Sequence, residues 1–178
     1  MTTRRVGQRV GASSMAVYSE FGSLGGLVAS VVTAGFDALA DALAVVETTD
    51  DPVQDLWRTA LAYRGFALAR PHVYRAMYGL NAPGGYRRTG DELALGSETF
   101  GSFVATAERA RRQGLVVRDD SFEMALAGWT WLHGWVVNEL AGYPDVYPRA
   151  PLVHMQIGFT ALLRGFGASI DLELPLPD

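Results

Sequence analysis

The chain has 178 residues, of which 49% are hydrophobic and 19% are charged. A chain of this size and composition can bury a substantial core, which excludes a disordered protein and indicates one domain, or one domain with a small appendage. It contains no cysteine, which excludes a disulfide framework and a thiolate metal site. Its net charge of −4 argues against a protein that coats nucleic acid over its whole surface.

The charge is unevenly distributed along the chain. Residues 1–19 contain Arg4, Arg5 and Arg9 and no acid, so they carry +3, and residues 20–178 therefore carry −7. A basic start on an acidic body fits DNA contact confined to one end of the molecule. A solvated basic terminus without a partner is the alternative interpretation.

Residues 6–21 predict two short helices joined by a tight turn. Val6 and Val10 are four residues apart and would share the inward face of the first helix. Gly11 can end that helix, because glycine adopts the left-handed conformation that a helix end often needs. Ser13 can cap a second helix by accepting a hydrogen bond from a backbone N–H group.

Val17 and Phe21 would share the inward face of that second helix. A helix, a short turn with glycine and a second helix form the helix-turn-helix unit, whose second helix enters the major groove of DNA. The segment also resembles the recognition segment of TetR-type transcriptional regulators. The spacing of Ala16-Val17-Tyr18, and of Phe21 with Leu27, is the most specific part of this resemblance.

The resemblance implies roles for the residues of both helices. Members of the family place one more helix before these two, but only Met1–Arg5 precede Val6, and an average helix has about 11 residues. We therefore expect either a true start upstream of Met1 or an incomplete DNA-binding unit. Phosphates would be attracted by Arg5 and Arg9. The DNA backbone would be hydrogen-bonded by Ser13 and Tyr18, and base edges would face Ser14, Met15 and Ala16.

A long helix is predicted from Ser23 to about Val46. It is apolar enough to raise the question of a membrane span, but a polar stripe interrupts it at helical spacing, made of Ser30, Thr33, Asp37 and Asp41. This pattern indicates an amphipathic helix against a core. No signal peptide is visible, and we expect a cytoplasmic protein with no membrane contact. The predicted domains are 1–46, with the helix-turn-helix, and 47–178.

The remainder of the chain predicts further helices and no strand, and therefore an all-α fold. The expected helices span residues 53–70, 72–79, 91–113, 121–141 and 151–166, with an irregular loop at 81–90 and caps at Asp51 and at Asp119 or Ser121. The last turn of the helix predicted at 91–113 contains Arg109, Arg111 and Arg112. Cations in a last turn interact favourably with the helix dipole, and we prefer this interpretation to a nucleic-acid patch. Glu139 is expected at the surface.

Two further segments extend the family resemblance. Residues 71–79, PHVYRAMYG, and the later Trp131-Leu132-His133-Gly134 resemble the WHG-type ligand-binding and dimerisation domain of TetR regulators. In that family the last two helices pair with their copies from a second subunit into a four-helix bundle. Small residues at helical spacing let another helix approach closely. The predicted homodimer interface comprises Trp135, His154, Gly158, Ala161 and Gly165.

The sequence gives no support for catalysis or for a metal site. The three histidines have no second ligand at helical spacing, no nucleophile elbow is visible, and no cofactor is expected. The helical body is nevertheless rich in aromatic residues, and apolar pockets lie between the helices of bundles. We expect a small, mainly apolar effector bound by Trp57, Tyr63, Tyr78, Phe103, Trp131 and His133. The alternative is that each of these residues belongs to the core.

These observations predict a TetR-like regulator of transcription. It would act as a homodimeric, ligand-responsive repressor that binds operator DNA. The alternative is a dimeric small-molecule-binding module that has lost DNA binding, and a third interpretation is a helical enzyme that uses the same aromatic cavity. The sequence does not identify the effector, the operator or the controlled genes, nor does it decide between repression and activation.

Overall fold

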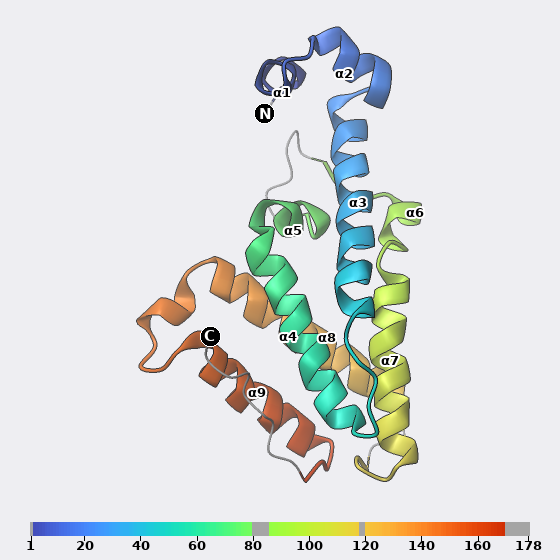
Figure 1. The fold of residues 1–178 in the computed structure, drawn as a ribbon, viewed down its shortest axis with the longest axis vertical. Coiled ribbons are helices and arrows are strands. Elements are labelled where there is room, and N and C mark those ends of the chain that lie inside the picture. Colours follow the sequence, from blue (N-terminus) through green and yellow to red (C-terminus); the bar gives the residue numbers. More distant parts are fainter. Residues whose placement is uncertain (1, 80–85, 118–119, 170–178) are drawn as a thin grey trace. The chain divides into compact units, whose positions relative to one another are not determined.

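The computed structural model describes residues 2–79, 86–117 and 120–169 (Figure 1). Within these ranges the regular structure is helical throughout, without a strand, which confirms the predicted all-α fold. Its elements are α1 (Thr3–Val10), α2 (Ser14–Phe21), α3 (Leu24–Ala44), α4 (Pro52–Ala69), α5 (Pro71–Met77), α6 (Gly90–Leu93), α7 (Ser97–Arg112), α8 (Ser121–Leu140), the 3-10 helix η2 (Tyr143–Val146) and α9 (Pro151–Gly165). Most of the loop predicted at 81–90 lies outside the described residues.

The helices gather into two compact units. Unit 1 contains Met1–Asp41 and Ala69–Ser97, and unit 2 contains Ala42–Leu68 and Glu98–Asp178. Helices α5 and α6 therefore belong to the same unit as the first helices. Packing units need not coincide with functional domains, and the predicted division into 1–46 and 47–178 stays a prediction.

The turn between α1 and α2 follows from residues that lie close together in the sequence. Gly11 ends α1 with a positive φ of 70°, and the Ser13 hydroxyl caps α2 by accepting from the Ala16 N–H at 3.0 Å. A Cβ atom on Gly7 would lie 2.5 Å from the carbonyl oxygen of Ala12, so only glycine allows this close approach. The predicted helix end at Gly11 and the predicted cap at Ser13 are confirmed.

One predicted inward position of this unit, Val10, is wrong. Val17 is buried and Val6 is half-buried, but Val10 is 70% exposed. The buried residues of α1 are Thr3 and Gly7. Val10 is the last residue of α1, so the chain turns away before its side chain can reach α2.

Helix α3 has the amphipathic pattern that the sequence predicts. Its buried stripe consists of Val28, Val32, Phe36, Leu39 and Leu43, and its polar stripe of Ser30, Thr33, Asp37 and Asp41 is exposed. Among the described residues, α3 is the one helix whose length and composition would suffice for a membrane span. A core helix of a soluble protein has the same properties.

The predicted helix over 91–113 is interrupted. The structure has a short α6, then Gly96 with a positive φ of 87°, and then α7. A Cβ atom on Gly96 would lie 2.6 Å from Cε1 of Phe36, so the chain bends where it passes the α3 ring. The helix period alone did not reveal this break, because it depends on a residue 60 positions away.

Caps set the beginnings of two helices in unit 2. Asp51 caps α4 by accepting from the N–H groups of Val53 and Gln54, as predicted. Helix α8 is capped by Asp120, not by Asp119 or Ser121, and its carboxylate accepts from the N–H groups of Phe122 and Glu123.

Aromatic contacts join the four long helices of unit 2. Trp57 of α4 lies 5.6 Å from Phe159 of α9, and Tyr63 of α4 lies 5.0 Å from Trp129 of α8, between ring centroids. Trp129 also lies 5.6 Å from Phe103 of α7. Such pairs contribute about 0.5–1.5 kcal/mol each beyond the area they bury. These aromatic residues of unit 2 therefore pack against one another in its core.

Candidate functional site

The seven residues predicted to contact DNA lie on α1, on α2 and in the turn between them (Figure 1). Arg5 and Arg9 are exposed on α1. On α2, Met15 is 73% exposed and Tyr18 is 49% exposed, although both are large apolar or aromatic side chains. Of the remaining three residues, Ser13 and Ala16 are exposed and Ser14 is half-buried.

A tight turn fixes α2 on the beginning of α3. Ser23 caps α3 by accepting from the Gly26 N–H at 2.9 Å. A Cβ atom on Gly26 would lie 2.0 Å from the carbonyl oxygen of Phe21, so a side chain at this position would push the two helices apart. Gly26 therefore serves the close approach of α2 and α3, which gives a physical reason for glycine at the start of a long helix.

The predicted ligand-binding residues are divided between the two units. Tyr78 belongs to unit 1, where its ring lies 4.9 Å from that of Tyr74 and 5.8 Å from that of Phe36. The Arg88 guanidinium lies 5.1 Å above the same Phe36 ring and donates to the carbonyl of Met77. Tyr78 is thus part of an aromatic cluster on α3 and α5.

The other predicted ligand-binding residues lie in unit 2, where Tyr63 and His133 form a pair. The Tyr63 hydroxyl lies 3.3 Å from Nδ1 of His133, and Tyr63 is fully buried. Burial lowers the pKa of His133 from its ordinary value of 6.5, so the imidazole is neutral at pH 7. This contact joins α4 to α8 and gives His133 a structural role.

A second polar contact joins the same two helices. Arg64 of α4 forms a two-pronged ion pair with Glu139 of α8, with 2.8 Å between Nε and Oε2. The expectation that Glu139 lies at the surface is wrong, since its side chain is only 8% exposed. Its partner is 75 residues away in the sequence and could not be read from local pattern.

A third polar cluster surrounds Asp55, a buried residue that the sequence did not single out. Arg109 of α7 lies 3.0 Å from its carboxylate and also donates to the carbonyl of Thr49, while Arg58 donates to the other carboxylate oxygen. Burial alone would raise the pKa of Asp55, but hydrogen bonds from Thr49 and Arg109 outweigh it and lower the pKa below 3.8. Arg109 thus holds the loop before α4, which the helix-dipole interpretation did not foresee.

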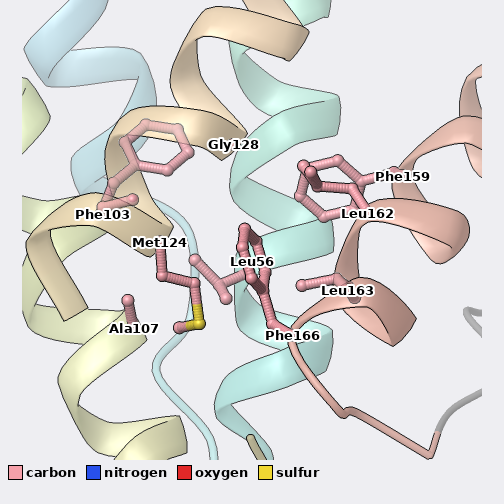
Figure 2. Close-up of a pocket in the computed structure, with 10 residues that line it drawn as sticks. Leu56, Phe103, Ala107, Met124, Gly128, Phe159, Leu162, Leu163 and Phe166 are labelled. Atoms are coloured by element: carbon pink, nitrogen blue, oxygen red, sulfur yellow. The ribbon is translucent and has the colours of Figure 1, made fainter. Parts of the chain in front are cut away.

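Unit 2 also contains an apolar cavity (Figure 2). Its volume is about 20 Å³, which is room for one or two water molecules. The lining residues come from α4, α7, α8 and α9 and the residue after it, and are Leu56, Phe103, Ala107, Met124, Ala125, Gly128, Phe159, Leu162, Leu163 and Phe166. Phe103 is the one predicted ligand-binding residue among them. Trp57 and Trp131 are not among these lining residues, but the ring centroid of each lies 5.6 Å from that of Phe159.

The predicted dimer-interface residues lie on α8 and α9, with differing exposure. Ala161 and Gly165 are exposed, whereas Gly158 lies under Trp131 of its own chain, where an added Cβ would be 2.5 Å from Cζ2. Trp135 is half-buried and stacked on Trp131, with centroids 6.2 Å apart. His154 is half-buried too.

The structure indicates exposed positions on these helices that the sequence analysis missed. On α8, Thr130, Gly134 and Asn138 follow one another at four-residue spacing and are exposed and uncharged. Ile157 is exposed on α9, four residues before Ala161. The four-residue spacing of these positions is visible in the sequence, but the prediction for α8 named Trp135 instead, and the dimer interface stays a prediction.

Among the described residues, no group of three or more His, Cys, Asp or Glu side chains could hold a metal ion.

Several solved structures share this fold. A protein of unknown function from Rhodococcus sp. RHA1 is 24% identical with a TM-score of 0.75, covering 93% of this chain and 84% of that chain. A regulatory protein of the tetR family from Rhodococcus RHA1 is 19% identical (TM-score 0.73; 96% and 88%). The TetR family transcriptional regulator PfmR from Thermus thermophilus is 20% identical (TM-score 0.67; 92% and 88%). At these identities the likeness concerns the fold.

The sequence itself gives the family. No curated protein matches the chain. Residues 56–165 match the family model described as "Tetracyclin repressor-like, C-terminal domain". Because this match spans more than half of the chain, and because TetR-family regulators share its fold, the protein belongs to the TetR-like family, which supports a role in the regulation of transcription.

Proposed function

We propose that this protein is a homodimeric regulator that binds operator DNA through α2 and releases it when a small apolar molecule binds to unit 2. The observation that carries the proposal is the α1–turn–α2 unit, whose second helix exposes Met15 and Tyr18 while its inner face is buried at Val17. A helix that exposes side chains of this kind next to arginines is suited to a DNA groove.

In this proposal the residues of α1 and α2 divide into two groups. Arg5 and Arg9 attract phosphates, and Ser13 and Tyr18 hydrogen-bond the DNA backbone; these contacts set register and carry no sequence information. The base edges are read by Ser14, Met15 and Ala16. Since α2 is fixed on α3 by the turn at Gly26, a shift of α3 moves the reading helix with it.

The dimer would form through the exposed faces of α8 and α9. Gly134 and Gly165 have no atom within 4 Å of an added Cβ, so the surface beside them is open. Together with Thr130, Ile157 and Ala161 they form an exposed, uncharged, mostly small-residue face on two adjacent helices. Small residues on facing helices allow close approach in a four-helix bundle. Trp135, His154 and Gly158 would support this face from within.

The effector response would originate in unit 2. The cavity is lined by Phe103 and backed by Trp57 and Trp131 through Phe159, and Tyr63 and His133 join α4 to α8. A ligand here would bias the packing of these helices and, in the dimer, the spacing of the two reading helices, which must match half-sites about 34 Å apart. Tyr78, which directly follows α5 in unit 1, stays a predicted ligand-binding residue. We place this activity in the cytoplasm.

Fluorescence anisotropy tests the DNA-binding half of the proposal. The DNA comes from the region upstream of the protein's own coding sequence, and binding is measured at about 50 and 200 mM salt. Arg9→Gln should weaken binding and reduce the salt slope by about one, whereas Arg112→Gln, which removes an exposed arginine from α7, should change neither. Equal effects of the two variants, or no specific binding at all, would contradict the proposal and favour a dimeric ligand-binding module.

A further inference from the structure

We infer that α2 recognises its operator mainly through the methyl groups of thymines, which Met15 and Ala16 contact in the major groove. Each half-site therefore contains T·A pairs at the positions that face these two residues. This inference rests on the proposed function and adds the class of base sequence that α2 reads. The chemistry of the exposed side chains of α2 supports it.

The exposed side of α2 is centred on Met15 and Ser19. An α-helix has about 3.6 residues per turn, so the residues two positions before and after the buried Val17 point to the opposite side of the helix. Met15 is 73% exposed, and Ser19 and Ala16 are exposed beside it. Met15 and Ala16 belong to the first turn of α2, and the N-terminal residues of a reading helix are those that reach base edges.

The side chains of α2 lack the groups that usually read guanine and adenine. A guanine is recognised by two hydrogen bonds from arginine or lysine, and an adenine by two from asparagine or glutamine. The sequence of α2, SMAVYSEF, contains none of these four residue types. Serine hydroxyls bond to several bases and therefore discriminate little. Apolar side chains can distinguish thymine, because its C5 methyl group has no counterpart on the other three bases.

Glu20 offers one alternative, because a carboxylate can accept a hydrogen bond from N4 of cytosine. It lies in the last turn of α2, away from the N-terminal end that reaches base edges. It is also the one acidic residue of α1 and α2, and phosphates repel a carboxylate. The main readout is therefore placed at Met15, and recognition of cytosine by Glu20 is an outcome that the test can distinguish.

The thioether of Met15 is well suited to contact a methyl group. It is flexible and polarisable, so it adapts to the position of its neighbour, and both groups leave water on contact. Loss of one buried methyl group weakens binding about fourfold in Kd, or by about 0.8 kcal/mol. In a homodimer, the loss of one contacted methyl group in each half-site weakens it about 15-fold. Nonspecific binding should not change, because Arg5 and Arg9 contact phosphates in the proposal.

Replacement of thymine by deoxyuridine tests the inference, because deoxyuridine keeps the hydrogen-bonding groups of thymine and lacks only the C5 methyl group. The DNA is an inverted repeat enriched from a random duplex library, and Kd is measured by fluorescence anisotropy. Each invariant thymine is replaced in turn in both half-sites. We expect a loss of about 15-fold at the most sensitive position and no loss outside the half-sites. A C·G pair at that position should bind weakly, and 5-methylcytosine in this pair should restore most of the affinity.

Two variants assign the methyl contact to Met15. In Met15→Ala, deoxyuridine at the most sensitive position should weaken binding by about twofold or less, because the group that contacts the methyl is gone. Ser19→Ala is the matched control, since it changes an exposed residue on the same side of α2. This variant should show the same loss with deoxyuridine as the unmodified protein. An equal loss in Met15→Ala would contradict the assignment to Met15.

The remaining outcomes separate the inference from the proposed function. Enriched half-sites without thymine, or an unchanged Kd with deoxyuridine at every position, would overturn the inference and leave the proposed function standing. An invariant cytosine whose preference is lost in Glu20→Gln would show that α2 reads cytosine instead. If no sequence is enriched, the proposed function itself is contradicted, and the inference with it.

Discussion

Gly158 on α9 provides a sharp test of how α8 and α9 pack within one chain. A Cβ atom at this position would lie 2.5 Å from Cζ2 and 3.2 Å from Cε2 of Trp131, whereas ordinary contacts begin at 3.4 Å. The indole cannot simply rotate away, because it is stacked on Trp135 and lies 5.6 Å from Phe159. Gly158→Ala must therefore displace a rigid ring system.

The size of the effect follows from two opposing contributions. Inserting a methyl group into a packed site costs about 1–3 kcal/mol. Replacing glycine by alanine inside a helix gains about 0.5–1 kcal/mol. We expect Gly158→Ala to lower the free energy of unfolding by about 0–2.5 kcal/mol, with the middle of both ranges giving about 1 kcal/mol. Gly101→Ala, on an exposed face of α7 with no atom within 4 Å of its Cβ, should raise it by about 0.5–1 kcal/mol.

Urea denaturation followed by tryptophan fluorescence measures both variants. The protein concentration must be the same throughout, because the stability of a dimer depends on it. If Gly158→Ala proves as stable as Gly101→Ala, the close contact between Gly158 and Trp131 is wrong.

The contact also means that a substitution at Gly158 is a poor test of the dimer interface, because it disturbs packing within one chain. Ala161→Glu, at an exposed position, is the cleaner one, and sedimentation should show a shift toward monomer.

Three further predictions concern pH, a buried polar cluster and DNA. The unfolding free energy should fall from about pH 7 to about pH 5, because the His133 side chain takes up a proton at a higher pH in the unfolded chain than in the folded one. In urea titrations, His133→Asn should flatten this fall, whereas His72→Gln, at an exposed position, should not. Arg109→Gln should lower the unfolding free energy by about 1–3 kcal/mol, since Asp55 would lose a charged partner; a change no larger than that of exposed Arg112→Gln would contradict this role. Tyr18→Phe should weaken binding to all DNA sequences alike in anisotropy titrations, and an altered sequence preference would exclude the backbone role.

The sequence predicted the fold best where local chemistry decides it. Gly11, Ser13 and Asp51 mark helix ends through contacts with residues at most five positions away, and each stands where it was expected. The polar stripe of α3 was correct for the same reason, since helical periodicity alone places it. The family resemblance at the start and at residues 131–134 then limited the fold to one architecture.

The errors arose where distant residues decide. Gly96 breaks a helix because Phe36 lies against it, and Glu139 is buried because Arg64 pairs with it. Neither partner is visible in a local pattern. The prediction that Val10 faces inward is wrong for a different reason. Its spacing fits the inward face of α1, but the chain turns immediately after it and its side chain is exposed.

The candidate site was predicted only in part. Large aromatic residues suggested a pocket, but most of them pack against one another, as Tyr63 does with Trp129. The cavity is defined instead by ordinary core residues such as Leu56 and Met124, together with Gly128, a position where a side chain is missing. No composition or spacing rule distinguishes these from other core residues. The residues of α1 and α2 stay predictions until DNA binding is measured.

Selection of bound sequences from a random DNA duplex library tests the central claim most directly, because it does not require the operator sequence to be known. A dimer with one reading helix per subunit predicts enrichment of an inverted repeat whose half-sites are centred about 10 base pairs apart, or a multiple of that spacing. A variant with Ser14→Ala and Met15→Ala should enrich a different repeat at the same spacing. Failure to enrich any sequence, or enrichment of a single asymmetric site, would contradict the account.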